Sequence, residues 1–197
     1  MPSQSAHRPP APPHETSDEV LARRAGLGDR DAFAVIVQRH GPALYRYAAR
    51  VLDNSADVQD AVQEAFIGAW QGLGGYRGDA GLRTWLFTLV RRKAYPRIAR
   101  FPASGSRPHL SIDDVAATLA DRYADPAALH SSTALLAALD AALRTLPERQ
   151  RSAWILKHVE DLTYAQTARV LGVSPDAVRG LLERARTSLA ITLKEWR

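Results

Sequence analysis

The sequence predicts an all-α protein made of two small helical domains joined by a flexible linker. Its 197 residues suit one or two small domains, since a single core usually takes about 100–150 residues. Apolar residues recur at spacings of three and four, whereas sustained alternation and Asn-Gly or Asp-Gly hairpin turns are absent. The helical spacing lapses around Pro102, Pro108 and Pro126, which indicates a break between two helical units.

These patterns divide the chain into four parts: an arm over 1–17, a first domain over 18–101, a linker over 102–132 and a second domain over 133–197. The arm contains five prolines and no apolar core, so we expect it to be disordered and not a signal peptide. No apolar run approaches the ~18 residues that span a bilayer, so we expect no membrane insertion and a cytoplasmic location. The absence of cysteine excludes disulfides, thiolate metal sites and thiol catalysis.

Four helices are expected in the first domain. Thr16 and Glu19 form a capping box for a short helix that ends near residues 26–28. A second helix extends from about Asp31 towards Leu52, and Gly41-Pro42 should bend or interrupt it. A third covers about 55–70, and a fourth begins near Leu82 after a glycine-rich stretch, 72–81, which has the composition of a flexible loop.

Charge is segregated in this first domain. Residues 51–76 contain four acids and no Lys or Arg, whereas residues 83–107 contain seven basic residues and no acid. One interpretation is a pair of solvated helix faces that neutralise each other. The other is two functional surfaces, an acidic one for a protein and a basic one for phosphates, which the net charge of +5 and the pI of 9.9 also favour.

The second domain contains the most specific local pattern, a helix-turn-helix over residues 164–178. Ala168 is small enough for the crossing of two helices, and Gly172 tolerates the positive φ of the turn. Ser174 is a good N-cap and Pro175 suits the first position of the next helix. An inward stripe (Val178, Leu181, Leu182, Ala185, Leu189) leaves polar side chains facing outward, as in a recognition helix for the major groove.

Enzymatic interpretations are weak. Asp57, Asp60 and Glu64 share one helix face and could suggest the Mg²⁺ site of a nuclease, but no basic residue that could assist lies nearby in sequence. The histidines form no metal-binding motif, and P-loop, nucleophile-elbow and dinucleotide fingerprints are absent. We therefore expect no catalytic residue, no metal and no cofactor.

The glycine-rich loop carries an aromatic residue beside a cation. Tyr76 and Arg77 stand directly before the basic helix, and a stacking ring next to cations suits single-stranded nucleic acid. The alternative is that Tyr76 only covers the helix bundle.

Five motifs, in this order along the chain, resemble a known family. Residues 60–66 (Asp-Ala-Val-Gln-Glu-Ala-Phe), 76–79 (Tyr-Arg-Gly-Asp) and 84–86 (Thr-Trp-Leu) are similar to the second conserved region of bacterial RNA polymerase sigma factors, and to the extracytoplasmic-function (ECF) subfamily in particular. Residues 146–151 (Leu-Pro-Glu-Arg-Gln-Arg) and the helix-turn-helix resemble the fourth conserved region. The resemblance covers about 165 of the 197 residues.

The resemblance implies an alternative sigma factor that directs core RNA polymerase to specific promoters and assists their opening. It implies three binding surfaces. The core-polymerase surface, for the clamp coiled coil of the largest subunit, is Asp57, Asp60, Gln63 and Glu64. The −10 surface is Tyr76, Arg77, Asp79, Arg91, Arg92, Lys93 and Arg97, and the −35 surface is Ser174, Asp176, Arg179, Glu183 and Arg184. Further implied partners are the second-largest polymerase subunit, promoter DNA and an anti-sigma protein.

Three residues depart from the family pattern. Arg92 and Pro96 stand where members often carry Asn and Asp or Asn, and Leu181 stands where many relatives have Arg. We expect Pro96 to break the fourth helix. The alternative function is an autonomous helix-turn-helix regulator, which would bind its promoter tightly without polymerase.

Overall fold

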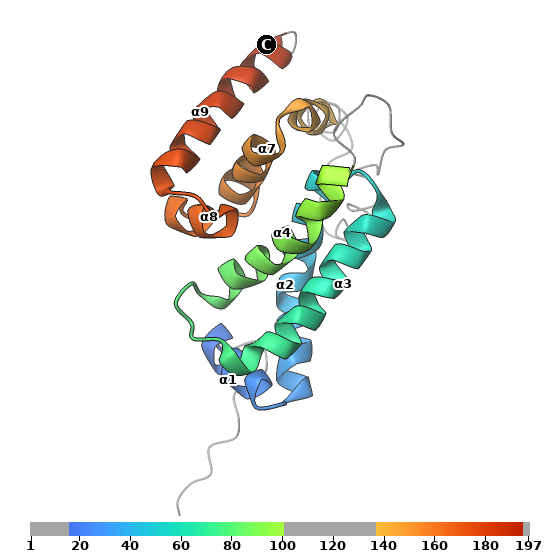
Figure 1. Ribbon diagram of the computed structural model, residues 1–197, viewed down its shortest axis with the longest axis vertical. Coiled ribbons are helices and arrows are strands. Elements are labelled where there is room, and N and C mark those ends of the chain that lie inside the picture. The colour runs from blue at the N-terminus through green and yellow to red at the C-terminus, as the bar shows by residue number, and fades with distance from the viewer. Residues whose placement is uncertain (1–15, 101–136, 195–197) are drawn as a thin grey trace, which may run out of the picture.

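The structure is a computed structural model that describes residues 16–100 and 137–194, and all regular structure in these ranges is helical (Figure 1). This agrees with the predicted fold class. Most of the expected arm and all of the expected linker lie outside the described residues.

The first helical body contains α1 (Asp18–Gly26), α2 (Arg30–Val51), α3 (Ser55–Gly72), the short η1 (Leu73–Gly75) and α4 (Leu82–Arg100). Side-chain caps fix three of the helix starts. Asp29 accepts a hydrogen bond from the backbone N–H of Ala32, and Asn54 accepts one from that of Ala56. The start of α1 differs from the prediction, because Ser17 and not Thr16 is the N-cap and accepts from the N–H of Val20.

Neither proline interrupts its helix, so the expected break at Pro96 was wrong, and the interruption considered at Pro42 does not occur. Pro42 lies inside α2 and Pro96 inside α4. A proline removes one backbone hydrogen bond, and the buried residues on both sides of Pro42, such as Ile36 and Leu44, hold α2 against its neighbours. Tertiary packing therefore outweighs the local preference at this position.

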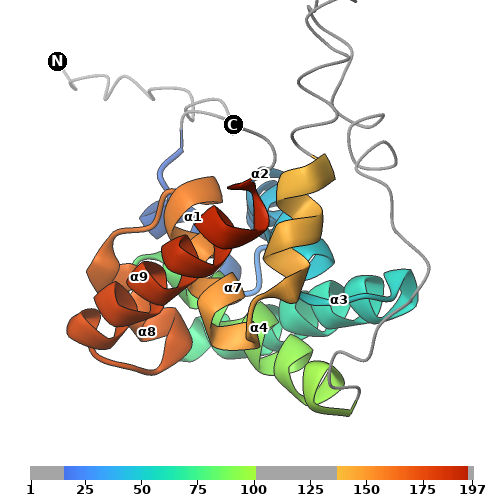
Figure 2. The ribbon, with the colours of Figure 1, turned by 90° about the horizontal axis from the view of Figure 1, so that it is seen from above.

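The second body contains a helical segment over 137–145, α7 (Glu148–Trp154), the π-helical turn η2 (Ile155–Val159), α8 (Tyr164–Leu171) and α9 (Pro175–Thr192). α8 and α9 form the predicted helix-turn-helix. In Figure 1 this body lies along one side of α4, with α9 outermost, and in the view from above it covers α4 and part of α2 (Figure 2).

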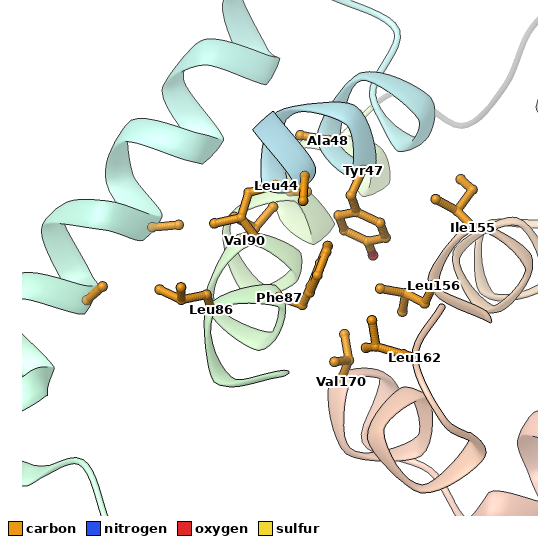
Figure 3. Close-up of a cluster of buried hydrophobic side chains, with 14 of the residues drawn as sticks. Leu44, Tyr47, Ala48, Leu86, Phe87, Val90, Ile155, Leu156, Leu162 and Val170 are labelled. Carbon is orange, nitrogen blue, oxygen red and sulfur yellow. The ribbon is translucent and has the colours of Figure 1, made fainter. Parts of the chain in front are cut away.

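The two bodies share one continuous hydrophobic core. Tyr47 of α2 and Phe87 of α4 are fully buried, with ring centroids 5.7 Å apart and nearly perpendicular planes. From the second body, Leu156, Leu162 and Val170 belong to the same buried cluster, and they face Phe87 in Figure 3. The sequence predicted two separate cores and missed this joint one.

A smaller hydrophobic cluster joins the first helical segment of the second body to α9. Ala142, Leu143 and Leu146 pack against Ala185 and Leu189 of α9, and all five are buried. Within the described ranges, no helix is long and apolar enough to cross a membrane.

Candidate nucleic-acid interface

The helix-turn-helix has the local geometry that its sequence predicts. Thr163 and Gln166 form a reciprocal capping box at the start of α8. Gly172 ends α8 with φ +66°, a left-handed conformation that side chains other than glycine rarely adopt. Ser174 then accepts a hydrogen bond from the N–H of Ala177 at 3.1 Å, and Pro175 occupies the first turn of α9. The turn therefore sets the direction in which α9 leaves the domain.

The outer face of α9 is polar and open. All five residues of its predicted inward stripe are buried, Leu181 included. Asp176, Arg179, Glu183 and Arg184 are exposed. Such a face can place guanidinium donors and carboxylate acceptors against base edges and phosphates.

Two arginines on this face differ in how firmly they are held. The guanidinium of Arg179 pairs with Asp176 and lies over the Tyr164 ring, 5.5 Å from its centroid. Arg184 has no ion pair within the described ranges, and its guanidinium lies beside Gly180. The guanidinium of Arg179 is thus held in one place by Asp176 and Tyr164, whereas no ion pair within the described ranges holds that of Arg184.

The cations of α4 are not all directed outward. Arg91 pairs with Glu148 of the second body at 3.5 Å and is only 13% exposed. Arg97 contacts Glu64 at 2.8 Å and Asp57 at 3.6 Å. Arg92 is exposed and forms no ion pair within the described residues. Of the cations predicted on α4 to bind DNA, the structure leaves Arg92 open and holds Arg91 and Arg97 against carboxylates.

The acidic face of α3 is divided in the same way. Asp60 and Gln63 are exposed, whereas Glu64 accepts a hydrogen bond from Arg97 and also lies 3.3 Å from Lys93. These cations hold the pKa of Glu64 below its usual value, and the hydrogen bond from Arg97 is the main cause. The interpretation of mutually neutralising helix faces is therefore right for Asp57 and Glu64. Among the described residues, no cluster of three or more His, Cys, Asp or Glu could hold a metal ion.

Tyr76 packs on the helix bundle and also borders a surface hollow. Its ring lies 5.0 Å from that of Trp85. The hollow, about 500 Å³, is formed by α1 and the loop after α3; its lining includes Glu19, Arg23, Leu73, Tyr76 and Arg77. Burial, with Asp18, Glu19 and Asp79 nearby, raises the pKa of Tyr76, so the phenol stays protonated and can donate a hydrogen bond. Arg77 and Asp79 are exposed beside it.

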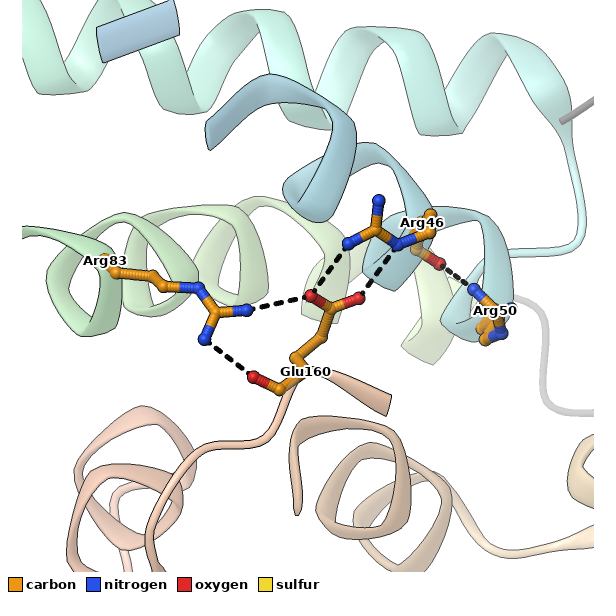
Figure 4. A network of polar contacts seen from close by, with 4 residues as sticks. All are labelled: Arg46, Arg50, Arg83 and Glu160. Carbon is orange, nitrogen blue, oxygen red and sulfur yellow. Dashed lines mark hydrogen bonds and ion pairs between the residues drawn. The ribbon is translucent and has the colours of Figure 1, made fainter. Parts of the chain in front are cut away.

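Sequence reasoning missed a charged cluster between the two bodies, which we call the Glu160 cluster: Glu160, Arg46 and Arg83. The Glu160 carboxylate is completely buried and accepts hydrogen bonds from both arginines (Figure 4). The only sequence signal was an acid between Val159 and Leu162, next to a second acid, Asp161. That pattern does not distinguish a buried carboxylate from an exposed one.

Comparison with known proteins supports the same two units. The family model of sigma-70 region 2 matches residues 36–100, and that of sigma-70, region 4 matches residues 136–189. The ECF RNA polymerase sigma factor SigM of Mycobacterium tuberculosis (strain ATCC 25618 / H37Rv) is 36% identical over 177 residues, covering 90% of this chain and 85% of SigM. The ECF RNA polymerase sigma-E factor of Escherichia coli (strain K12) is 31% identical and covers 89% of this chain and 93% of its own length.

Solved structures agree on the fold. CnrH in complex with the cytosolic domain of CnrY superposes with a TM-score of 0.68 at 30% identity, covering 90% of this chain and 97% of that one. The sigma factor RpoE in complex with the anti-sigma factor NepR from Bartonella quintana superposes with a TM-score of 0.62, covering 84% of this chain and 98% of RpoE; at 22% identity it supports the fold alone.

A helix-turn-helix with an open recognition face, joined to a four-helix unit that matches region 2, defines a transcription initiation factor of the sigma type. The chain belongs to the ECF sigma factors of RNA polymerase. It acts as an alternative sigma factor in transcription initiation, and the autonomous regulator is not favoured.

Proposed function

We propose that α9 reads the −35 element of a promoter, that the loop of residues 76–79 and the open cation Arg92 hold the −10 element, and that the exposed part of α3 docks on core polymerase. The observation that carries this proposal is the outer face of α9, where Asp176, Arg179, Glu183 and Arg184 are exposed while the opposite stripe is buried. Each surface acts by binding, and we assign it no chemical step.

The −35 surface is tested on Arg184. We expect Arg184→Ala to weaken binding of the holoenzyme to promoter DNA by roughly 1–3 kcal/mol if this guanidinium contacts a base. Lys194→Ala is the control, because Lys194 is an exposed cation of the same domain that follows the end of α9. Affinity is compared on promoters that differ at single −35 positions. A loss that is uniform across all sequences indicates a phosphate contact, and no loss contradicts the role of Arg184.

The core-polymerase surface is tested on Asp60. Asp60 is exposed on α3 and has no ion pair in the described ranges, so a substitution there leaves the packing of α3 on α4 intact. We expect Asp60→Lys to lower the affinity for purified core polymerase by roughly 2 kcal/mol or more. Gln59→Lys adds the same cation at the adjacent exposed position and should have a smaller effect. Equal affinities for the two variants would remove the acidic face of α3 from the interface.

Besides promoter DNA and core polymerase, we propose a third partner, a protein that binds the chain and keeps it inactive. CnrH, at 30% identity, was solved in complex with the cytosolic domain of CnrY, which supports a protein ligand on a chain of this fold. We propose that the chain meets these partners in the cytoplasm, where RNA polymerase and the promoter are found. Co-purification from cells with and without cross-linking tests for such a partner, and recovery of core polymerase alone would contradict it.

A further inference from the structure

We propose that Asp176 and Tyr164 are positioning residues, which hold the guanidinium of Arg179 in the place from which it reads a guanine of the promoter. This inference rests on the proposed function, because it requires the outer face of α9 to meet DNA. It deepens that function by assigning part of the sequence preference to a unit of one acid, one aromatic ring and one arginine.

The first support is that Arg179 has partners on both helices of the helix-turn-helix. Asp176 precedes it by three positions on α9 and forms an ion pair with it. Tyr164 lies in the first turn of α8, and the guanidinium carbon of Arg179 is 5.5 Å from the centre of its ring. One contact to its own helix and one to the neighbouring helix together restrict the guanidinium more than either contact alone.

The second support is that the Tyr164 ring is itself fixed. It is half-buried and packs against the main hydrophobic core. The reciprocal capping box of Thr163 and Gln166 fixes the backbone before and after it. The ammonium group of Lys157 lies 5.7 Å from the centre of the same ring. Because core and cap hold the ring, a guanidinium that lies over it is placed relative to the whole domain.

The third support is the charge of Asp176, which is unfavourable on a surface that faces DNA. Its side chain is 85% exposed, and an unpaired carboxylate there would repel phosphates. The N-cap of α9 does not require it, because Ser174 fills that position and accepts a hydrogen bond from the N–H of Ala177. The ion pair neutralises the carboxylate, so its location is explained by a role in holding Arg179.

The other two arginines of this face are not held in the same way. Arg186 pairs with Glu183 at 2.8 Å, but it forms no cation–π contact within the described residues. Arg184 has no ion pair in the ranges that the structure describes, and its guanidinium lies beside Gly180. Of these arginines, Arg179 is therefore the one that both an acid and a ring hold.

A guanidinium that is held in this way suits base reading. Arginine binds guanine through O6 and N7 together, so its planar fork must meet both acceptors at once. An arginine that is already ordered loses less rotamer freedom on binding, and it is less free to turn to a phosphate instead. We therefore expect Arg179 to prefer guanine over the other bases by roughly 5- to 150-fold.

The test measures the affinity of the holoenzyme for promoter fragments that carry each of the four bases at each −35 position. Arg179→Ala first identifies the position at which the preference for guanine is lost. We expect Asp176→Asn and Tyr164→Leu each to lower the preference at that same position by roughly three- to fivefold. Tyr164→Phe should retain the preference, because the ring remains. If Arg179→Ala changes no preference, Arg179 reads no base and the proposal is overturned.

A matched control and a double variant separate positioning from other roles of Asp176. The control is Asp161→Asn, because Asp161 is an exposed acid of the same body outside the proposed surfaces, and Asn tolerates its φ of +53°. In the Arg179→Ala background, Asp176→Asn should change the preference no further. An equal change in affinity for all sequences, as a role in helix stability or overall charge would produce, would overturn the proposal. A changed preference in the double variant, or at another position, would also overturn it.

A measurement on the unbound chain needs neither DNA nor polymerase. The Tyr164 ring should shift the proton resonances of the Arg179 side chain in NMR spectra, and we expect Tyr164→Leu to abolish this shift and Asp176→Asn to reduce it. Absence of the shift in the unmodified chain would overturn the hold on Arg179. A shift that is present while the holoenzyme shows no preference at any −35 position would instead contradict the proposed function and leave the hold itself intact.

Discussion

A glycine in the middle of the recognition helix provides a quantitative test of how α9 is used. Gly180 lies inside α9, and glycine in a helix interior is about 1 kcal/mol less favourable than alanine. Outside the backbone of α9 itself, the three atoms nearest to a Cβ built at Gly180 all belong to the guanidinium of Arg184, with Nη1 at 3.4 Å and Nη2 at 3.8 Å. That group ends a flexible side chain, so it can move aside.

We therefore expect Gly180→Ala to stabilise the folded chain by about 0.5–1 kcal/mol, which raises the Tm by about 1–4 °C for a chain of this size. Thermal unfolding followed by circular dichroism measures it. Ala190→Gly, at an exposed position of the same helix, is the reciprocal control and should lower the Tm. Glycine has no side chain, so it allows DNA to approach the backbone of α9 closely at this position. We therefore expect the more stable Gly180→Ala variant to bind the promoter less tightly.

Two results would refute this reasoning. A lower Tm for Gly180→Ala would mean that the added methyl group meets an obstacle that the structure does not contain. A higher Tm with unchanged promoter affinity would mean that DNA does not approach α9 at Gly180, and the recognition face would then have to be centred elsewhere on the helix.

Two further predictions concern pH. Burial raises the pKa of Tyr47 to about 12 from its ordinary value of 10.0, so the stability contributed by the neutral phenol is complete below pH 10 and is lost between pH 10 and about 12. This loss of folding free energy is about 3 kcal/mol, and denaturant titration at several pH values measures it. The variant Tyr47→Phe should not show it, because it has no phenol to ionise. Burial lowers the pKa of His40 below 6.5, although Asp18 at 3.0 Å opposes the shift, so the folded chain should lose stability as the pH drops below 6.5 towards that lower pKa. The variant His40→Gln should show a smaller dependence of stability on pH in this range. An unchanged dependence would contradict the role of His40.

The helix-turn-helix could be predicted in detail because its signals are local. The N-cap Ser174, the left-handed Gly172 and the inward stripe of α9 each depend on residues within a few positions of one another. The same holds for the four helices of the first body, apart from the exact N-cap of α1. Local rules failed at Pro42 and Pro96, where the helix continues through the proline.

The contact between the bodies could not be predicted, because it joins residues far apart in sequence. Tyr47 and Ser152 are 105 positions apart, and Arg46 and Glu160 are 114 positions apart. Helical periodicity identifies which face of a helix is apolar, but not which distant element covers it. Tyr47 and Phe87 lie in the core of the first body, and they also belong to the hydrophobic cluster that includes residues of the second body.

The basic run of α4 has two roles that compete with each other. Arg91 pairs with Glu148 of the second body, and the resemblance to sigma factors places the same guanidinium on the predicted −10 surface. In both cases the charge is paired, so exchanging the carboxylate for a phosphate replaces one charge-assisted contact by another of similar strength. A phosphate that reaches Arg91 therefore offsets most of the free energy that is lost when its pair with Glu148 breaks, whereas without an anionic partner that pair persists.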